Sequence, residues 1–212
     1  MAEEGNDRHR GSLPMNKVSD EEIMLQVRNG AGEMLGVLFD RYQTPLFNFY
    51  ARLTANRAVS EDLVQEVFLR ILKYRHTYTP GNSFRTWLYQ IARNARADHL
   101  RTHRPQTPLT QDLGGSFTPR DAAVEQQESQ LLGRALMQLR EDQREILVLS
   151  RLQELKHEEI AQLLGCEVGA VKVRVHRALK ELKETFHLLQ SRGSAETAGG
   201  GAGRPPQRGA GV

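Results

Sequence analysis

The sequence is poor in the residues on which several classes of protein depend. A single cysteine in 212 residues excludes an internal disulfide and a cysteine-rich metal site, and it fits a reducing compartment. No apolar run approaches the roughly 18 residues of a membrane-spanning helix. The first 17 residues also lack the apolar core of a secretory signal. We therefore expect a cytoplasmic protein without direct membrane insertion.

Sequence motifs for catalysis are missing as well. His157 and Glu158 begin like the helix of a zinc protease, but Ala161 stands where the second histidine ligand is required. The glycines at 199–203 lack the lysine and hydroxyl residue of a phosphate-binding loop. There is no nucleophile elbow and no spaced set of cysteines and histidines. We expect neither enzyme activity nor a bound metal or cofactor.

Polar and glycine-rich segments divide the chain. Residues 1–17 are polar, residues 101–127 contain prolines and a Gly-Gly pair, and residues 191–212 are rich in glycine. They predict a disordered N-terminus, a flexible linker and a disordered tail. In residues 18–100 and 128–190, apolar side chains recur mostly three or four positions apart, which is typical of amphipathic helices. The expected fold class is all-α, with two small helical domains joined by the flexible linker.

Segment 157–182 predicts a helix-turn-helix in the C-terminal domain. Ile160 and Leu164 give the first helix an apolar face, and Gly165 permits a sharp turn after it. The apolar anchors of the second helix are Val171, Val175 and Ala178. In such a motif the second helix lies in the major groove of DNA.

The second helix of this motif is basic. Five cationic side chains lie between Lys172 and Lys183, against Glu181 alone. They can neutralise phosphates, and Arg177 can reach a guanine edge. The alternative interpretation is a solvated basic helix in a helical hairpin. Cys166, in the turn, is interpreted as a small core residue, with a redox switch as the alternative.

The helix expected at 60–73 has two different faces. Ser60 is its candidate N-cap. Its apolar stripe includes Leu63, Val67 and Ile71. Asp62, Glu66 and Leu69 are left on another side, where carboxylates around an exposed leucine suit docking to a basic partner. A solvated helix face is the alternative interpretation.

Residues 74–104 combine aromatic, amide and cationic side chains. The loop contains Tyr78, Asn82 and Ser83. Against Asp98 stand Arg93, Arg96, Arg101 and Arg104. This mixture suits unstacked bases and a single-stranded backbone. Trp87 is interpreted as core, Asn94 fits a buried amide as well as a base contact, and Arg96 is the candidate phosphate contact.

Four segments together resemble a known family, the extracytoplasmic-function sigma factors, the smallest group of promoter-recognition subunits of bacterial RNA polymerase. The segments are LFDRYQTPLFNF (38–49), EDLVQEVFLRI (61–71), FRTWLYQIARN (84–94) and LREDQREILVLSRLQELKHEEIAQLLGCEVGAVKVRVHRAL (139–179). They follow the family's order and spacing. The resemblance implies that residues 18–100 are sigma region 2, which binds core polymerase and the −10 element. It implies that residues 128–190 are sigma region 4, which binds the −35 element.

The resemblance also assigns roles to particular residues. In the family, the acidic helix docks on a coiled coil of the polymerase's largest subunit, a role that passes to Asp62, Gln65, Glu66 and Leu69. Contacts with the melted −10 element are assigned to Tyr78, Asn82, Ser83 and Asn94, to which the charge pattern adds Arg96. Contacts with the −35 element are assigned to Lys172, Arg174, His176 and Arg177. Val173 departs from the family, where many members have serine, so one polar DNA contact is missing.

The implied function is promoter recognition, promoter melting and transcription initiation for an alternative regulon. The implied partners are core RNA polymerase, promoter DNA (a −35 duplex and a melted −10 non-template strand) and a cognate anti-sigma factor, and the free chain is expected to be a monomer. Two alternatives remain. A stand-alone regulator would bind its operator without polymerase, whereas an interaction adaptor would support no promoter-dependent transcription.

Overall fold

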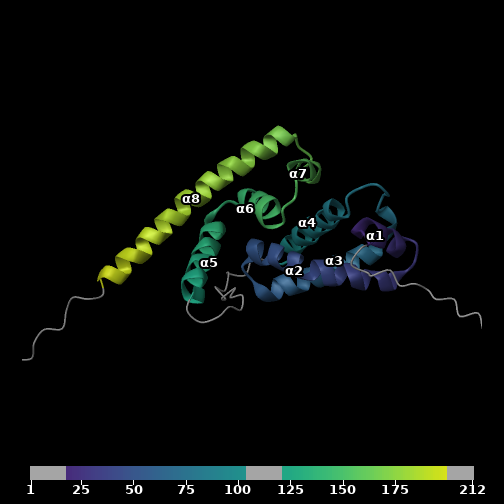
Figure 1. Cartoon of the computed structure of the whole chain (residues 1–212), viewed down its shortest axis with the longest axis horizontal. Helices are drawn as coiled ribbons and strands as arrows, with labels where there is room; N and C mark the ends of the chain where they lie inside the picture. Colours follow the sequence, from purple (N-terminus) through teal and green to yellow (C-terminus); the bar gives the residue numbers. More distant parts are fainter. Residues whose placement is uncertain (1–17, 104–120, 200–212) are drawn as a thin grey trace, which may run out of the picture. The chain divides into compact units, whose positions relative to one another are not determined.

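Helices form every regular element in the residues that the structure, a computed structural model, describes: 18–103 and 121–199 (Figure 1). The α-helices are α1 (Asp20–Arg28), α2 (Leu35–Thr54), α3 (Arg57–Tyr74), α4 (Phe84–Thr102), α5 (Asp121–Gln138), α6 (Glu141–Leu147), α7 (His157–Leu164) and α8 (Val168–Gly199). The predicted all-α fold class is confirmed. Within the same ranges, no helix combines the length and apolar character needed to cross a membrane.

The described residues form two compact units. One contains residues 18–46 and 63–103, and the other contains residues 47–62 and 121–199. The sequence predicts a division between 18–100 and 128–190, so the end of α2 and the start of α3 group differently from that expectation. This grouping depends on tertiary contacts, which a helical periodicity does not contain.

Two helices extend beyond their expected limits. Helix α5 begins at Asp121, inside the expected linker, and α8 continues to Gly199, although a tail is expected from residue 191. Both extensions contain alanine and glutamate, which have high helix propensity, and elongating a helix is easier than starting one. The rest of the expected linker and tails (1–17, 104–120 and 200–212) lies outside the described residues.

Helix α1 is attached to α2 by a partly buried polar cluster in the first unit. A capping box starts α1: the Ser19 hydroxyl accepts from the Glu22 N–H at 3.2 Å, and the Glu22 carboxylate accepts from the Ser19 N–H at 3.0 Å. Asp20 then pairs with Arg41 of α2 at 2.5 Å and accepts a hydrogen bond from the Tyr42 hydroxyl. Burial, together with the Asp20 carboxylate, raises the pKa of Tyr42.

Helix α3 begins before the predicted cap. The Asn56 side-chain oxygen accepts from the Val59 N–H at 3.1 Å, so Asn56 caps this helix. Ser60 lies inside the helix, fully buried, and its hydroxyl donates to the Asn56 carbonyl at 2.7 Å. The prediction that Ser60 is the N-cap is therefore wrong, because the hydroxyl bonds back to the preceding turn.

The predicted helix-turn-helix is present in α7 and α8. Helix α7 ends at Leu164 and is followed by Gly165, whose φ of +61° is in the left-handed region that favours glycine. The next N–H, of Cys166, donates to the Ala161 carbonyl at 3.0 Å and closes the turn. Cys166 itself is half-buried.

Apolar side chains fix the two helices of this motif against the second unit's core. Those of α8 are Val171, Val175 and Ala178, all buried as predicted. In α7, Ile160 is buried as predicted, but Leu163 rather than Leu164 completes the buried face. The side of α8 opposite these anchors is left to solvent.

Candidate functional site

The acidic face of α3, defined as Asp62, Gln65, Glu66 and Leu69, lies on one side of the helix. These residues are spaced three or four positions apart, and the apolar positions between them point to the core. Asp62 and Gln65 are exposed, Glu66 is half-buried, and Leu69 is 62% exposed. The structure therefore brings the four predicted residues together on a solvent-facing surface, and their binding role stays a prediction.

Phe39 of α2 is a partly exposed aromatic side chain, although the apolar periodicity of the sequence alone would place it in the core. It is 37% exposed, and its ring centroid lies 4.8 Å from that of Phe68 in α3. Phe68 is only 6% exposed, so Phe39 is the member of this aromatic pair that faces solvent. Exposed large apolar side chains next to charged ones are typical of protein interaction surfaces.

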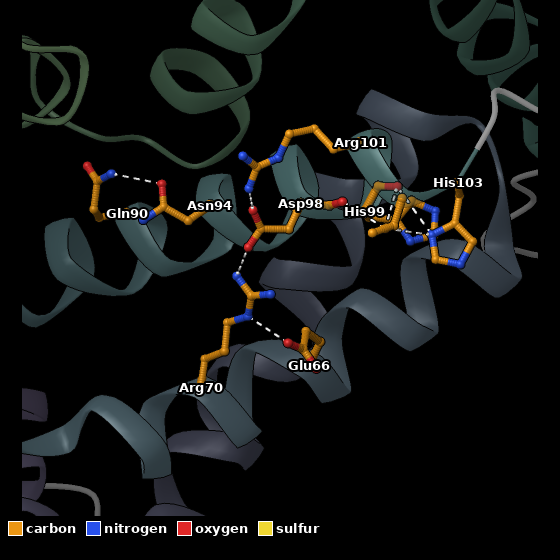
Figure 2. A network of polar contacts seen from close by, with 9 residues as sticks. Glu66, Arg70, Gln90, Asn94, Asp98, His99, Arg101 and His103 are labelled. Carbon is orange, nitrogen blue, oxygen red and sulfur yellow. Dashed lines mark hydrogen bonds and ion pairs between the residues drawn. The ribbon is translucent and has the colours of Figure 1, made fainter.

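A polar network connects α3 to α4 (Figure 2). Arg70 Nε lies 2.6 Å from a Glu66 carboxylate oxygen, and Arg70 Nη1 lies 2.6 Å from an Asp98 carboxylate oxygen. Asp98 also accepts from Arg101. These hydrogen bonds, the one from Arg70 first, lower the pKa of Asp98.

Sequence reasoning missed Arg70. The spacing of Glu66 and Arg70, four positions apart on a helix, is a signal for their ion pair. No comparable signal predicts the contact with Asp98, because it joins positions 28 residues apart in the chain.

Tyr78 is a buried support of the loop before α4. Its side chain is 1% exposed, its hydroxyl donates to the Asn82 carbonyl at 2.6 Å, and its ring centroid lies 5.3 Å from that of Trp87. Burial, with a smaller effect of Glu21 and Asp20, raises the pKa of Tyr78 to about 12. The expectation that Tyr78 contacts a base directly is therefore corrected, because its ring has no open face in this structure.

The rest of this loop forms the start of α4. Gly81 has a φ of +86°, and Ser83 caps the helix by accepting from the Thr86 N–H at 3.3 Å. Glu21 of α1 accepts from the Phe84 N–H at 3.0 Å. Ser83 thus already has a structural role, whereas the Asn82 side chain is exposed.

Asn94 and Arg96 occupy different sides of α4. Asn94 is exposed and accepts from the Gln90 side-chain amide at 3.2 Å, so it is not a buried amide (Figure 2). Arg96 is 8% exposed because it follows Leu88 and Ala92, both fully buried, at intervals of four. The prediction that Arg96 is an accessible phosphate contact is therefore wrong.

The basic face of α8 contains all four side chains predicted to contact duplex DNA. Lys172, Arg174, His176 and Arg177 are all exposed. The Arg174 guanidinium also lies 4.0 Å from the Cys166 sulfur in the turn. A row of cationic side chains on the second helix of a helix-turn-helix can contact phosphates and base edges at once.

Two parts of the chain match known sequence families, in the order that the resemblance of the four segments predicts. Sigma-70 region 2 matches residues 38–106, and sigma-70 region 4 matches residues 129–182. The RNA polymerase sigma factor CarQ of Myxococcus xanthus is 37% identical over 170 residues, which are 79% of this chain and 97% of CarQ. The ECF RNA polymerase sigma factor SigW of Bacillus subtilis is 28% identical over 177 residues, 77% of this chain and 95% of SigW.

Solved structures share the fold. CnrH, in complex with the cytosolic domain of CnrY, has a TM-score of 0.63 at 24% identity and covers 80% of this chain and 97% of its own. The sigma factor RpoE, in complex with the anti-sigma factor NepR from Bartonella quintana, has a TM-score of 0.58 at 23% identity, over 72% and 96%. From the two matched regions and the 37% identity with nearly the whole of CarQ, the chain belongs to the extracytoplasmic-function sigma factors, the subunits that direct bacterial RNA polymerase to promoters and initiate transcription.

Proposed function

We propose that this sigma factor docks on core RNA polymerase through the acidic face of α3. The observation that supports this most is the exposure of Leu69 one helical turn after the Glu66 carboxylate, on a helix whose other side is core. A partner that is basic and partly apolar fits such a surface. The family resemblance points to a coiled coil of the polymerase's largest subunit as that partner.

We propose that the −10 element contacts the loop before α4 and the exposed side of that helix. Asn82 and Asn94 both present exposed amides, which can hydrogen-bond the edges of unstacked bases. Tyr78 takes part as a positioning residue, since its hydroxyl holds the backbone carbonyl of Asn82. Ser83 supports the same loop as the cap of α4.

The −35 element, in this proposal, is read as duplex DNA by the basic face of α8. Arg177 has the length and fork geometry to contact a guanine edge, and Lys172 and Arg174 would neutralise phosphates.

A single small helix-turn-helix offers a modest interface with DNA. Because the −10 and −35 surfaces belong to one chain, binding at either raises the effective concentration of the other. Capture of flipped bases would offset part of the unstacking cost, a few kcal/mol per step.

Further properties follow from membership of this family. Sigma factors are not enzymes, and we propose that this chain has no catalytic activity, cofactor or metal of its own. We propose that it acts in the cytoplasm at promoters of an alternative regulon and is a monomer when free. NepR is in complex with RpoE of Bartonella quintana, and we propose that a cognate anti-sigma factor binds this chain too.

Run-off transcription with purified core polymerase and genomic fragments tests the proposal. Specific transcripts are expected only when the chain and core polymerase are both present. Leu69→Lys is expected to weaken co-purification with core polymerase and to reduce transcripts, because it places a cation where a basic partner docks. Leu188→Lys in α8 is the matched control, since Leu188 is 60% exposed and lies outside the acidic face.

Three outcomes would contradict parts of this proposal. Transcripts that do not require the chain would remove the initiation role. A footprint on DNA without polymerase would favour a stand-alone regulator. Equal polymerase binding by Leu69→Lys and the wild type would remove the docking surface while leaving the DNA surfaces unaffected.

A further inference from the structure

Val173 is an exposed hydrophobic side chain in the middle of the basic face of α8. It is 50% exposed, whereas Val171 and Val175 are 0% and 3% exposed and belong to the core. Its neighbours in the chain, Lys172 and Arg174, are exposed cations. Valine is β-branched and has lower helix propensity than lysine or glutamine, so neither core packing nor helix stability explains it.

The surroundings of Val173 leave it open to an approaching surface. Residues four positions apart share a side of a helix, so Gly169 precedes Val173 and Arg177 follows it on this side. Gly169 is exposed, and a Cβ atom placed there would meet nothing within 4 Å. Gly169 therefore contributes no side chain that could shield Val173, and the groove that Arg177 would enter also reaches the valine.

We propose that Val173 recognises the 5-methyl group of a thymine in the major groove of the −35 duplex. This inference rests on the proposed function of the basic face of α8. Thymine is the base that presents a methyl group in the major groove, and apolar side chains contact it there. Valine forms no side-chain hydrogen bond, so its contribution is a preference for thymine over a base of the same shape without the methyl group.

The position of the thymine follows from helix and duplex geometry. Side chains four positions apart on a helix have Cβ atoms about 5–6 Å apart, and successive bases are about 3.4 Å apart along a strand. The thymine read by Val173 therefore lies within about two base pairs of the base that Arg177 contacts. Arg177 favours guanine, so the expected pattern is a thymine close to a guanine.

Replacement of thymine by uracil tests the contact, because deoxyuridine lacks only the 5-methyl group. The probe is a promoter fragment selected from genomic DNA by run-off transcription, with each −35 thymine replaced in turn. The holoenzyme, assembled from the full chain and core polymerase, is titrated against each duplex. At one position the wild type is expected to lose about fourfold in affinity, the amount for one methyl group removed from water.

Variants of the chain assign this loss to Val173. Val173→Ala is expected to reduce the uracil effect below about twofold, whereas Val173→Ile keeps it. Leu188→Ala, another exposed apolar residue of α8, is expected to keep the full effect. Equal affinity for thymine and uracil at every position would overturn the assignment to Val173 but not the proposed function. An undiminished uracil effect in Val173→Ala would do the same. A holoenzyme that retains no genomic fragment overturns the proposed function, and the assignment with it.

Discussion

Replacing Tyr78 with phenylalanine separates two roles for this residue by removing one oxygen atom. A base-stacking platform would keep its function, because a phenyl ring stacks as a phenol does. A buried support would lose the hydrogen bond from its hydroxyl to the Asn82 carbonyl, at 2.6 Å. The ring is 1% exposed and the variant keeps it, so core packing is unchanged.

The size of the effect follows from this single bond. A hydrogen bond of this kind contributes about 0.5–1.5 kcal/mol net to stability. We expect Tyr78→Phe to lower the free energy of unfolding by about 1 kcal/mol in urea titrations followed by circular dichroism. Open-complex formation, followed by permanganate reactivity of unpaired thymines, should fall, while affinity for the −35 duplex stays unchanged.

Tyr74→Phe is the matched control for this experiment. Tyr74 is 42% exposed, so removing its hydroxyl is expected to change neither stability nor open-complex formation. Normal permanganate reactivity in a destabilised Tyr78→Phe would show that the bond supports the fold but not DNA opening. Unchanged stability in that variant would refute the reasoning from the buried hydrogen bond.

The basic face of α8 and the buried tyrosines give two further predictions. Lys172→Ala should weaken binding to all duplexes alike and reduce the slope of log affinity against log salt concentration by about 1. Arg177→Ala should instead cost about 1–3 kcal/mol of binding free energy on the −35 sequence selectively. Fluorescence anisotropy at several salt concentrations would measure both effects. Alkaline pH should destabilise the fold: the unfolded Tyr78 phenol loses its proton near pH 10, the folded one near pH 12. The free energy of unfolding, measured by denaturant titration at each pH, therefore falls as pH rises through that window, with Tyr42 and Tyr89 acting in the same direction.

Local patterns in the sequence predict much of this fold. The spacing of apolar side chains predicts the helices because burial of one face is a local property of each segment. Gly165 predicts the turn of the helix-turn-helix because few other residues adopt its left-handed conformation. The start of α3 was predicted wrongly, since Asn56 and Ser60 can each cap a helix in isolation. The grouping of residues 47–62 with the C-terminal unit likewise requires contacts distant in sequence.

In the candidate sites, too, local patterns predict some features, whereas features that depend on contacts distant in sequence were missed. The basic face of α8 is predicted correctly as exposed because its buried anchors fix the orientation of the helix. Arg96 was misplaced because it lies opposite Trp87 on a helical wheel, and Trp87, which the sequence analysis interprets as core, is itself only half-buried. Arginine also has a long apolar stem, which lets it occupy a buried position. The burial of Tyr78 depends on rings from other turns and cannot be obtained from the loop sequence.

Arg70 connects the proposed polymerase contact to the proposed −10 contact. Its side chain is 20% exposed and lies between carboxylates of α3 and α4, each at 2.6 Å. One carboxylate is that of Glu66 in the acidic face, and the other, of Asp98, lies one helical turn from Asn94. A planar guanidinium holds both carboxylates in fixed directions, as a lysine in its place would not. The two surfaces are therefore oriented by one side chain before any partner binds. Little further conformational entropy is then lost when these surfaces bind their partners.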